Sequence, residues 1–141
     1  MHENVFNKFP HSDISGSIVW IPILETDSFD AAIPSVRALS DDRIINFYDS
    51  NKMVGKIIAT SVGWPGHVAW DIYLFYGSTV EWSAAPPKPE FWMHQLSADW
   101  AKNDMYRTGD DLKYGLSVSM EKMGQSIAVG EEKTPVTEGT D

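Results

Sequence analysis

The residues whose chemistry could support acid–base catalysis or metal binding are mainly histidines. The chain contains four of them, His2, His11, His67 and His94. None forms an i,i+4 pair and none lies in a His-Glu-x-x-His pattern, the spacing by which a helix presents two imidazoles to a metal. A metal site would need residues that converge only in the fold, for example His67, Asp71 and His94. Because isolated imidazoles are more often solvated or merely hydrogen-bonded, we predict no metal site and no cofactor.

Asp71 is the most unusual carboxylate in the sequence. It stands between Trp70 and Ile72, in a predicted strand that should be largely buried. A buried carboxylate needs a partner or a shifted pKa. Asp71 could therefore act as a general base or as a polar contact to a ligand. The interpretation we favour is that Asp71 begins the strand and caps nearby backbone, so we assign no catalytic residue.

Aromatic residues are numerous, with six tryptophans and five tyrosines. They could line a ligand groove or a partner surface, or they could close a small core over a thin sheet. Several tryptophans lie in or beside predicted loops at strand ends. The candidate binding residues are Trp20, Trp64, His67, Trp70, Asp71, Trp92 and His94.

Composition excludes several classes of chemistry. The chain has no cysteine, so its own residues cannot form a disulfide, a thiolate metal site or a dithiol redox couple. The net charge of −9 argues against binding to nucleic acid. No serine lies in a Gly-x-Ser-x-Gly context, and the glycines form neither a Walker loop nor a dinucleotide fingerprint.

The length of 141 residues suits one domain, which we place at residues 1–129, followed by a flexible acidic tail at 130–141. No apolar run approaches the roughly 20 residues that span a bilayer, so we expect no membrane partner. The first ten residues lack the basic and apolar regions of a secretory signal. We therefore expect a cytoplasmic protein.

The first half of the chain alternates between strand and helix patterns. Residues 17–24 are nearly all apolar and β-branched or aromatic, as in a strand buried on both faces, although a proline limits its pairing. Ser28 can cap a helix that Pro34 would shorten. A second strand is predicted at 43–48. Asp49 can cap a second helix that ends before Gly63.

The second half begins with a hairpin pattern. A strand at 69–76, a Gly77-Ser78 turn and a strand at 79–82 predict a type II′ hairpin. Residues 84–89 form an extended connection because of their prolines, and residues 91–96 are ambiguous.

A final helix is predicted to begin at Asp110 or Asp111. It carries an apolar stripe at steps of three and four residues, made of Leu112, Leu116, Met120, Met123 and Ile127. The order of all these elements implies a mixed sheet with helices on its faces.

This order, together with the segments 19–24, 43–49, 69–76 and 91–96, resembles a bacterial family of thioredoxin-like proteins. The resemblance covers about residues 1–96. In that family a first strand and a Cys-x-x-Cys turn precede a segment similar to residues 2–6. The resemblance implies a thioredoxin-like α/β fold that is N-terminally incomplete or rearranged, without the strand that normally lies in the middle of the sheet.

Three arrangements could compensate for the missing strand. Strands 17–24 and 69–76 could pair directly, strand 43–48 could occupy the gap, or a second chain could supply the pairing. We favour a rearranged sheet with a homodimer contact. The expected function is a redox-inactive binding or assembly module for a protein or small-molecule ligand. The alternatives are a non-thiol enzyme near Asp71 and His67, or a fragment of a longer thiol-disulfide oxidoreductase.

Overall fold

The computed structural model describes residues 5–10 and 13–131. Its first elements follow the predicted order: β1 (Gly16–Trp20), α1 (Phe29–Ala38) and β2 (Ile44–Tyr48). The Ser28 side chain accepts a hydrogen bond from the Ala31 N–H and so caps α1, as predicted. The expectation that Pro34 shortens this helix is wrong, because α1 continues through Pro34 to Ala38.

The first strand is shorter than predicted and ends at Trp20 rather than at residue 24. The Asp27 carboxylate accepts hydrogen bonds from the N–H groups of Ile23 and Leu24, at 2.9 and 2.8 Å. Pro22 has no N–H to donate. These residues therefore satisfy their backbone groups locally instead of extending the ladder.

The second helix, α2, covers Met53–Ser61 and begins later than predicted. Asp49 lies before the start of this helix but still caps it, because its carboxylate accepts a hydrogen bond from the Val54 N–H at 2.7 Å. The helix stops at Gly63, which has φ +87°. The Trp64 N–H donates to the Ala59 carbonyl at 2.7 Å, the bond that defines a Schellman motif. The predicted glycine stop is confirmed.

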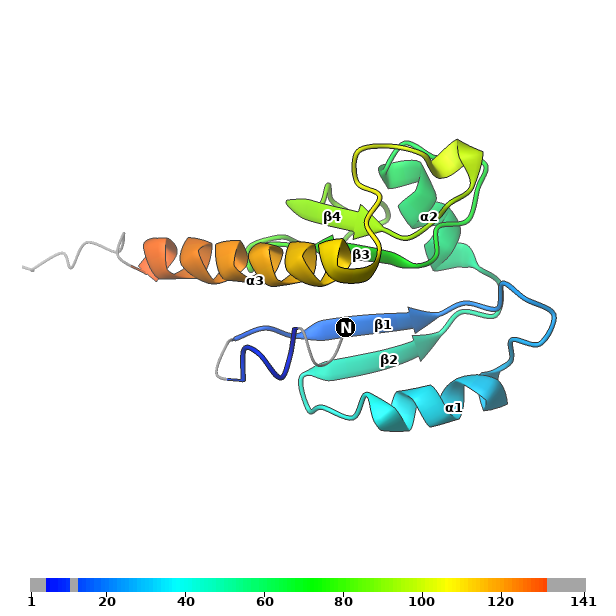
Figure 1. The fold of residues 1–141 in the computed structure, drawn as a ribbon, viewed down its shortest axis with the longest axis horizontal. Helices are drawn as coiled ribbons and strands as arrows, with labels where there is room; N and C mark the ends of the chain where they lie inside the picture. The colour runs from blue at the N-terminus through cyan, green and yellow to red at the C-terminus, as the bar shows by residue number, and fades with distance from the viewer. Residues whose placement is uncertain (1–4, 11–12, 132–141) are drawn as a thin grey trace, which may run out of the picture.

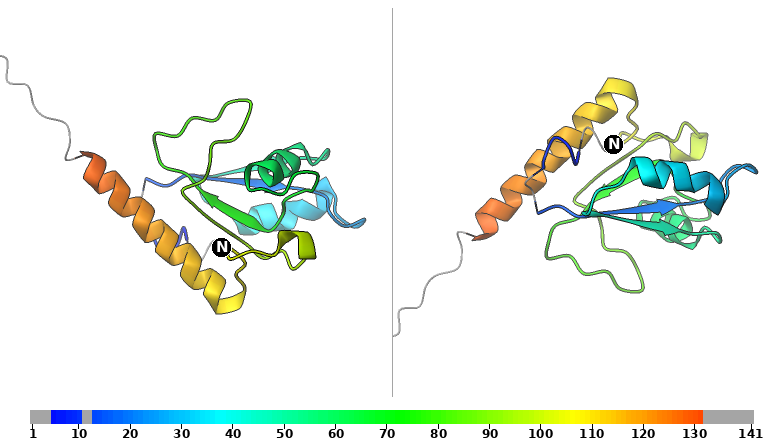
Figure 2. Two further views of the ribbon diagram at one scale, coloured as in Figure 1. Left: turned by 90° about the horizontal axis from the view of Figure 1, so that it is seen from above. Right: turned by 90° about the horizontal axis from the view of Figure 1, so that it is seen from below.

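The predicted hairpin is wrong. Strand β3 (Ile72–Phe75) pairs antiparallel with β4 (Phe91–His94), and residues 79–82 form no strand. The reason lies in burial: pairing with β4 brings Met93 into the core at 6% exposure, whereas Trp82 of the expected partner strand stays 55% exposed. The ambiguous segment 91–96 thus supplies the partner, and residues 76–90 form a long loop that stands out from the body of the molecule (Figure 2).

The last elements are a short 3-10 helix, η1 (Asp99–Ala101), and the long helix α3 (Gly109–Glu131). Four of the five stripe residues predicted for α3 are buried, as expected: Leu112, Leu116, Met120 and Met123. The side chain of Ile127 and the tail beyond residue 131 lie outside the described residues. No helix in the described ranges is long and apolar enough to cross a membrane.

The strands form two separate sheets instead of the predicted single mixed sheet. Strands β1 and β2 pair in parallel, from Gly16 opposite Ile44 to Trp20 opposite Tyr48, while β3 pairs only with β4. Figure 1 shows the strands in the order β4, β3, β1, β2. Neither intramolecular arrangement that we expected occurs, because β1 and β3 are not hydrogen-bonded to each other and β2 lies on the outer side of β1. The chain is nevertheless a mixed α/β protein, as its sequence predicts.

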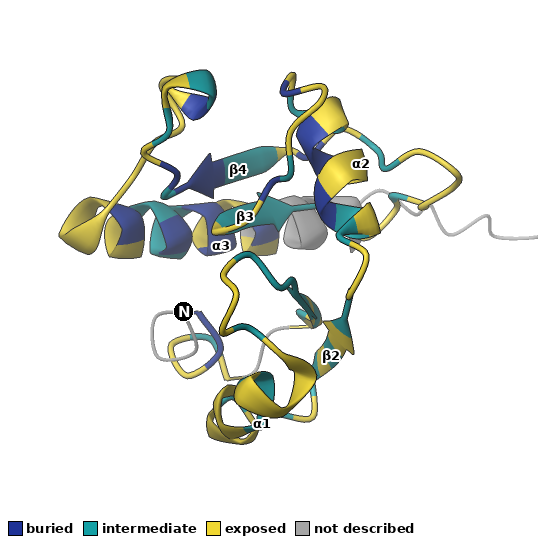
Figure 3. Cartoon of the chain, turned by 90° about the vertical axis from the view of Figure 1, so that its right-hand side faces the viewer, coloured by how far each residue is buried: buried dark blue, intermediate teal, exposed yellow. Residues whose placement is uncertain are grey.

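Two apolar clusters hold these elements together. One joins the N-terminal segment to β4 and α3 through Val5, Phe6, Met93, Leu112, Leu116 and Met120. The other joins α2 to the segments around β3 and β4 through Ile58, Ala59, Trp64, Ala69, Leu96 and Ala101. Helix α1 has no buried residue. Burial is therefore concentrated around α2, β4 and α3, as the colouring of Figure 3 shows.

Candidate functional site

The edge of β1 that faces away from β2 carries unpaired backbone groups. The Gly16 N–H donates to the Arg43 carbonyl at 2.8 Å, and the Trp20 carbonyl accepts the Asp49 N–H at 2.9 Å. Because alternate residues of a strand direct their backbone groups to opposite sides, the N–H and C=O groups of Ser17 and Val19 point away from β2.

Strand β3 has a matching unpaired edge. The carbonyls of Asp71 and Phe75 accept N–H groups from the β4 side of the sheet, from Gln95 at 3.0 Å and Glu90 at 2.9 Å. The backbone groups of Ile72 and Leu74 therefore point away from β4. Among the described residues, no backbone hydrogen bond connects these two residues, or Ser17 and Val19, to a further strand. We call these two edges, Ser17 and Val19 of β1 and Ile72 and Leu74 of β3, the seam.

Close packing around Gly55 holds one end of the seam. The Ala69 N–H donates to the Gly55 carbonyl at 2.9 Å, which ties α2 to the segment before β3. A Cβ atom at Gly55 would lie 2.6 Å from Val68 Cγ1 and 3.0 Å from Ile21 Cδ1. The residue after β1 and the residues before β3 thus meet at a position that only glycine fits.

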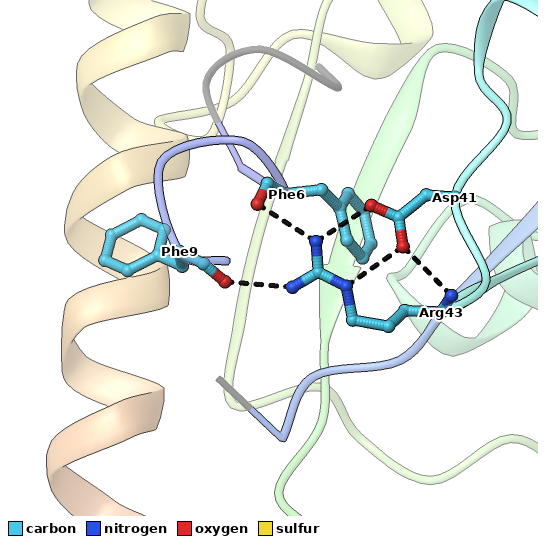
Figure 4. Close-up of polar contacts among 4 residues, drawn as sticks. All are labelled: Phe6, Phe9, Asp41 and Arg43. Atoms are coloured by element: carbon cyan, nitrogen blue, oxygen red, sulfur yellow. Dashed lines mark hydrogen bonds and ion pairs between the residues drawn. The ribbon is translucent and has the colours of Figure 1, made fainter. Parts of the chain in front are cut away.

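The N-terminal segment holds the other end. The Phe6 ring lies against Gly16 of β1, where a Cβ would come within 2.7 Å of it, and Phe6 also belongs to the cluster that includes Tyr73 and Phe75 of β3. Arg43 fixes this segment by donating to the carbonyls of Phe6 and Phe9, at 3.0 and 2.9 Å (Figure 4). Side chains therefore hold β1 and β3 near each other at both ends, although no hydrogen bond joins them.

The Arg43 guanidinium is itself held in place by Asp41. Two nitrogens of the guanidinium donate to the two carboxylate oxygens, at 2.9 and 2.8 Å, an arrangement that Figure 4 shows. The hydrogen bond to Asp41 raises the pKa of Arg43 above its usual value, against an opposing effect of burial. Arg43 therefore remains a cation and anchors residues 5–10 beside the seam.

Four of the predicted binding residues come together elsewhere, in an aromatic cluster between α2 and β4. The Trp64 ring lies 5.5 Å from Trp92, 4.9 Å from His94 and 5.5 Å from Trp100. His67 stacks on Trp100 with ring centroids 4.2 Å apart. Sequence reasoning missed Trp100, since η1 is too short to give a periodic pattern.

His94 uses both ring nitrogens for structure within this cluster. It is 0% exposed. Its Nε2 lies 3.1 Å from Asn103 Oδ1, and its Nδ1 accepts the Leu96 N–H at 3.2 Å, so the neutral ring carries its proton on Nε2. Burial lowers the pKa of His94, and the positive charge of Arg107 lowers it further, although the bond to Asn103 opposes the shift. This imidazole is not available for proton transfer to a ligand.

Two shallow cavities lie near the aromatic cluster and α2. One of about 230 Å³ is lined by Ser97, Lys102, Asn103 and Tyr106. The other, of about 260 Å³, lies between α2 and the loop after β3 and is lined by Ile57, Thr60, Ser61, Ala84, Ala85 and Pro86. None of the candidate residues predicted from the sequence lines either cavity.

Asp71 directly precedes β3 and is exposed, so the expectation of a buried carboxylate is wrong. Its backbone is left-handed, with φ +46°. Neighbouring atoms still desolvate the carboxyl group enough to raise its pKa. Burial and the Asp71 charge together raise the pKa of Tyr73, whose hydroxyl accepts a hydrogen bond from Gln95 Nε2 at 3.0 Å.

The remaining candidates do not join the aromatic cluster. Trp20 donates from Nε1 to Asn46 Oδ1 at 2.9 Å, and Trp70 is 38% exposed. Among the described residues, no hydrogen bond links Asp71 to His67. Within the same ranges no group of three histidine, aspartate or glutamate side chains could hold a metal ion.

Comparisons of this chain with protein-family models, with curated proteins and with solved structures found no match.

Proposed function

We propose that this chain is a binding or assembly module of thioredoxin-like type, without dithiol chemistry of its own, that takes an extended segment of a partner into the seam. One observation carries the proposal: β1 and β3 each present an edge whose backbone groups have no strand partner in the described chain. Unpaired strand edges are templates for adding a further strand.

The seam differs from an ordinary sheet edge in having two strands that could pair with the same segment. A strand that entered it could bond to Ser17 and Val19 on one side and to Ile72 and Leu74 on the other. It would then join the two sheets into one and occupy the central position that the family resemblance leaves empty. All four residues of β3 are only half-buried, so a segment there would also remove apolar surface from water.

No observation favours the alternative of a non-thiol enzyme at Asp71 and His67. His67 stacks on Trp100, Asp71 lies before β3, and no hydrogen bond links them in the part of the chain that the structure describes. His94 is fully occupied by structural bonds.

Binding of a strand-forming peptide tests the proposal. The probe is a fluorescein-labelled peptide of about nine residues that alternates valine and threonine, since about this length spans either strand with overhang. Its binding is followed by fluorescence anisotropy with the wild type, Ser17→Pro and Ser17→Ala. Ser17→Pro removes an N–H that points into the seam, whereas Ser17→Ala keeps it. We expect the proline variant to bind about tenfold or more weakly, and the alanine variant to bind like the wild type, as loss of a main-chain bond predicts.

A second copy of the chain could supply the extended segment, which is the homodimer that we expect from the sequence. Sedimentation velocity at micromolar concentration measures this association for the same three proteins. Self-association that Ser17→Pro abolishes supports the proposal with the chain as its own partner. A wild-type protein that neither binds the peptide nor self-associates would overturn it.

A further inference from the structure

We infer that Asp71, Tyr73 and Gln95 form a binding site for a cationic side chain, lysine or arginine, of the segment that enters the seam. The inference rests on the proposed function and adds the chemical class of the partner. Asp71 directly precedes β3, and its charge acts on the Tyr73 phenol, so the two side chains lie near each other. The Gln95 N–H donates to the Asp71 carbonyl at 3.0 Å, which places Gln95 across from Asp71.

The three side chains present oxygen atoms that suit a cation. The Tyr73 hydroxyl accepts the Gln95 amide N–H at 3.0 Å, and this bond orients both groups. The Asp71 carboxylate is close enough to Tyr73 for its charge to act on the phenol. A carboxylate with a phenol oxygen and an amide oxygen beside it can surround an ammonium or a guanidinium group, which carry only donors.

No cation of the described chain pairs with Asp71. The ion pairs that the structure shows among these residues join Lys8 to Glu121, Arg43 to Asp41, Lys102 to Asp99 and Lys113 to Asp110. Neighbouring atoms partly remove water from the Asp71 carboxylate without supplying an opposite charge. Desolvation disfavours the charged form until a cation compensates it, so an arriving ammonium or guanidinium would stabilise this group.

The position of Asp71 fits a segment that lies in the seam. Residues that face each other on paired strands direct their side chains to the same side of the sheet, with Cβ atoms about 5 Å apart. A lysine or arginine opposite Tyr73 would therefore lie close enough to reach the neighbouring Asp71 carboxylate with its long side chain. The net charge of −9 also attracts a basic segment from a distance.

Three labelled peptides of equal length test the inference by fluorescence anisotropy: valine alternating with lysine, with threonine, or with glutamate. The proteins are the wild type, Asp71→Asn and Asp30→Asn. Asparagine tolerates the left-handed backbone at position 71. Asp30 lies in the exposed first turn of α1, so its variant changes the net charge equally without touching the site. We expect the lysine peptide to bind the wild type about tenfold more tightly than the threonine peptide. This difference in affinity should disappear in Asp71→Asn and persist in Asp30→Asn.

The outcomes separate this inference from the proposed function. Equal binding of the lysine and threonine peptides to the wild type would overturn the cation site and leave the strand-binding module standing. Equal losses in Asp71→Asn and Asp30→Asn would also overturn it, because the attraction would then belong to the net charge. If the wild type binds none of the peptides and does not self-associate, the proposed function itself is contradicted.

Discussion

At the scale of single residues, two ionisable side chains in this molecule differ in their exposure to water. His94 is enclosed, neutral and bonded at both nitrogens. Asp71 is exposed yet partly desolvated, and no described cation pairs with it. The sequence identifies both as candidates, but it cannot tell them apart, because their surroundings come from Asn103, Leu96 and Gln95 through the fold.

His94 should make stability depend on pH below neutrality. Burial lowers its folded pKa, so as pH falls below about 6.5 the unfolded chain binds a proton that the folded chain does not. We therefore expect the free energy of unfolding to decrease from about pH 7.5 to about pH 5.5, as urea midpoints at both values measure. His94→Gln should reduce this slope. An unchanged slope in His94→Gln would contradict the structural role of His94.

Asp71→Asn should stabilise the free protein at neutral pH. Desolvation raises the folded pKa of Asp71, so its charged form opposes folding, and this opposition weakens as pH falls through the raised pKa. The stability gain of the variant, measured by urea denaturation, should accordingly be largest at neutral pH and shrink in acid. Asp71→Ala also removes the charge, but alanine disfavours φ +46° by about 1 kcal/mol or more and should be less stable than Asp71→Asn. A variant Asp71→Asn that is less stable than the wild type at neutral pH would show that the carboxylate has a stabilising partner.

At the scale of elements, the features predicted correctly are those set by neighbouring residues. Ser28 starts α1, Gly63 ends α2, and the stripe from Leu112 to Met123 faces the core. The partner of β3 could not be predicted in this way, because pairing with β4 depends on where Met93 is buried. Neither the unpaired edges of the seam nor the place of Trp100 could be predicted, since both depend on contacts between distant segments.

Two glycine substitutions should have opposite effects on stability. Gly63 has φ +87° with open space around it, so Gly63→Ala should destabilise the protein by about 1 kcal/mol through backbone strain alone. Gly124 lies inside α3, also with open space, so Gly124→Ala should stabilise it by up to about 1 kcal/mol. Thermal or urea unfolding of both variants measures this. A stability change in the same direction in both variants would contradict the assigned helix boundaries.

Arg43 should control the N-terminal segment. Arg43→Gln removes the cation that pairs with Asp41 and the two guanidinium hydrogen bonds to the carbonyls of Phe6 and Phe9. Residues 5–10 should therefore be cleaved faster in limited proteolysis. Arg37→Gln, in the last turn of α1, loses the same charge and is the matched control. Equal cleavage of both variants and the wild type would show that the segment is held by its apolar side chains alone.

At the scale of the whole molecule, two small sheets lie side by side without the hydrogen bonds that would make them one. Side chains bring β1 and β3 together at Gly55 and at Phe6, and between these points the outward backbone groups of Ser17, Val19, Ile72 and Leu74 have no strand partner among the described residues. Both the proposed module and its cation site depend on this single feature. The free protein should therefore show folded strands with accessible inner edges.

Amide hydrogen exchange of the free protein, resolved by NMR for each residue, tests this most directly. We expect the outward N–H groups of the seam, those of Ser17, Val19, Ile72 and Leu74, to exchange rapidly, while the inward N–H groups of Trp20 and Tyr73 on the same strands stay protected. Slow exchange at all these positions, with hydrogen bonds detected directly between the backbones of β1 and β3, would show one closed sheet and contradict the account.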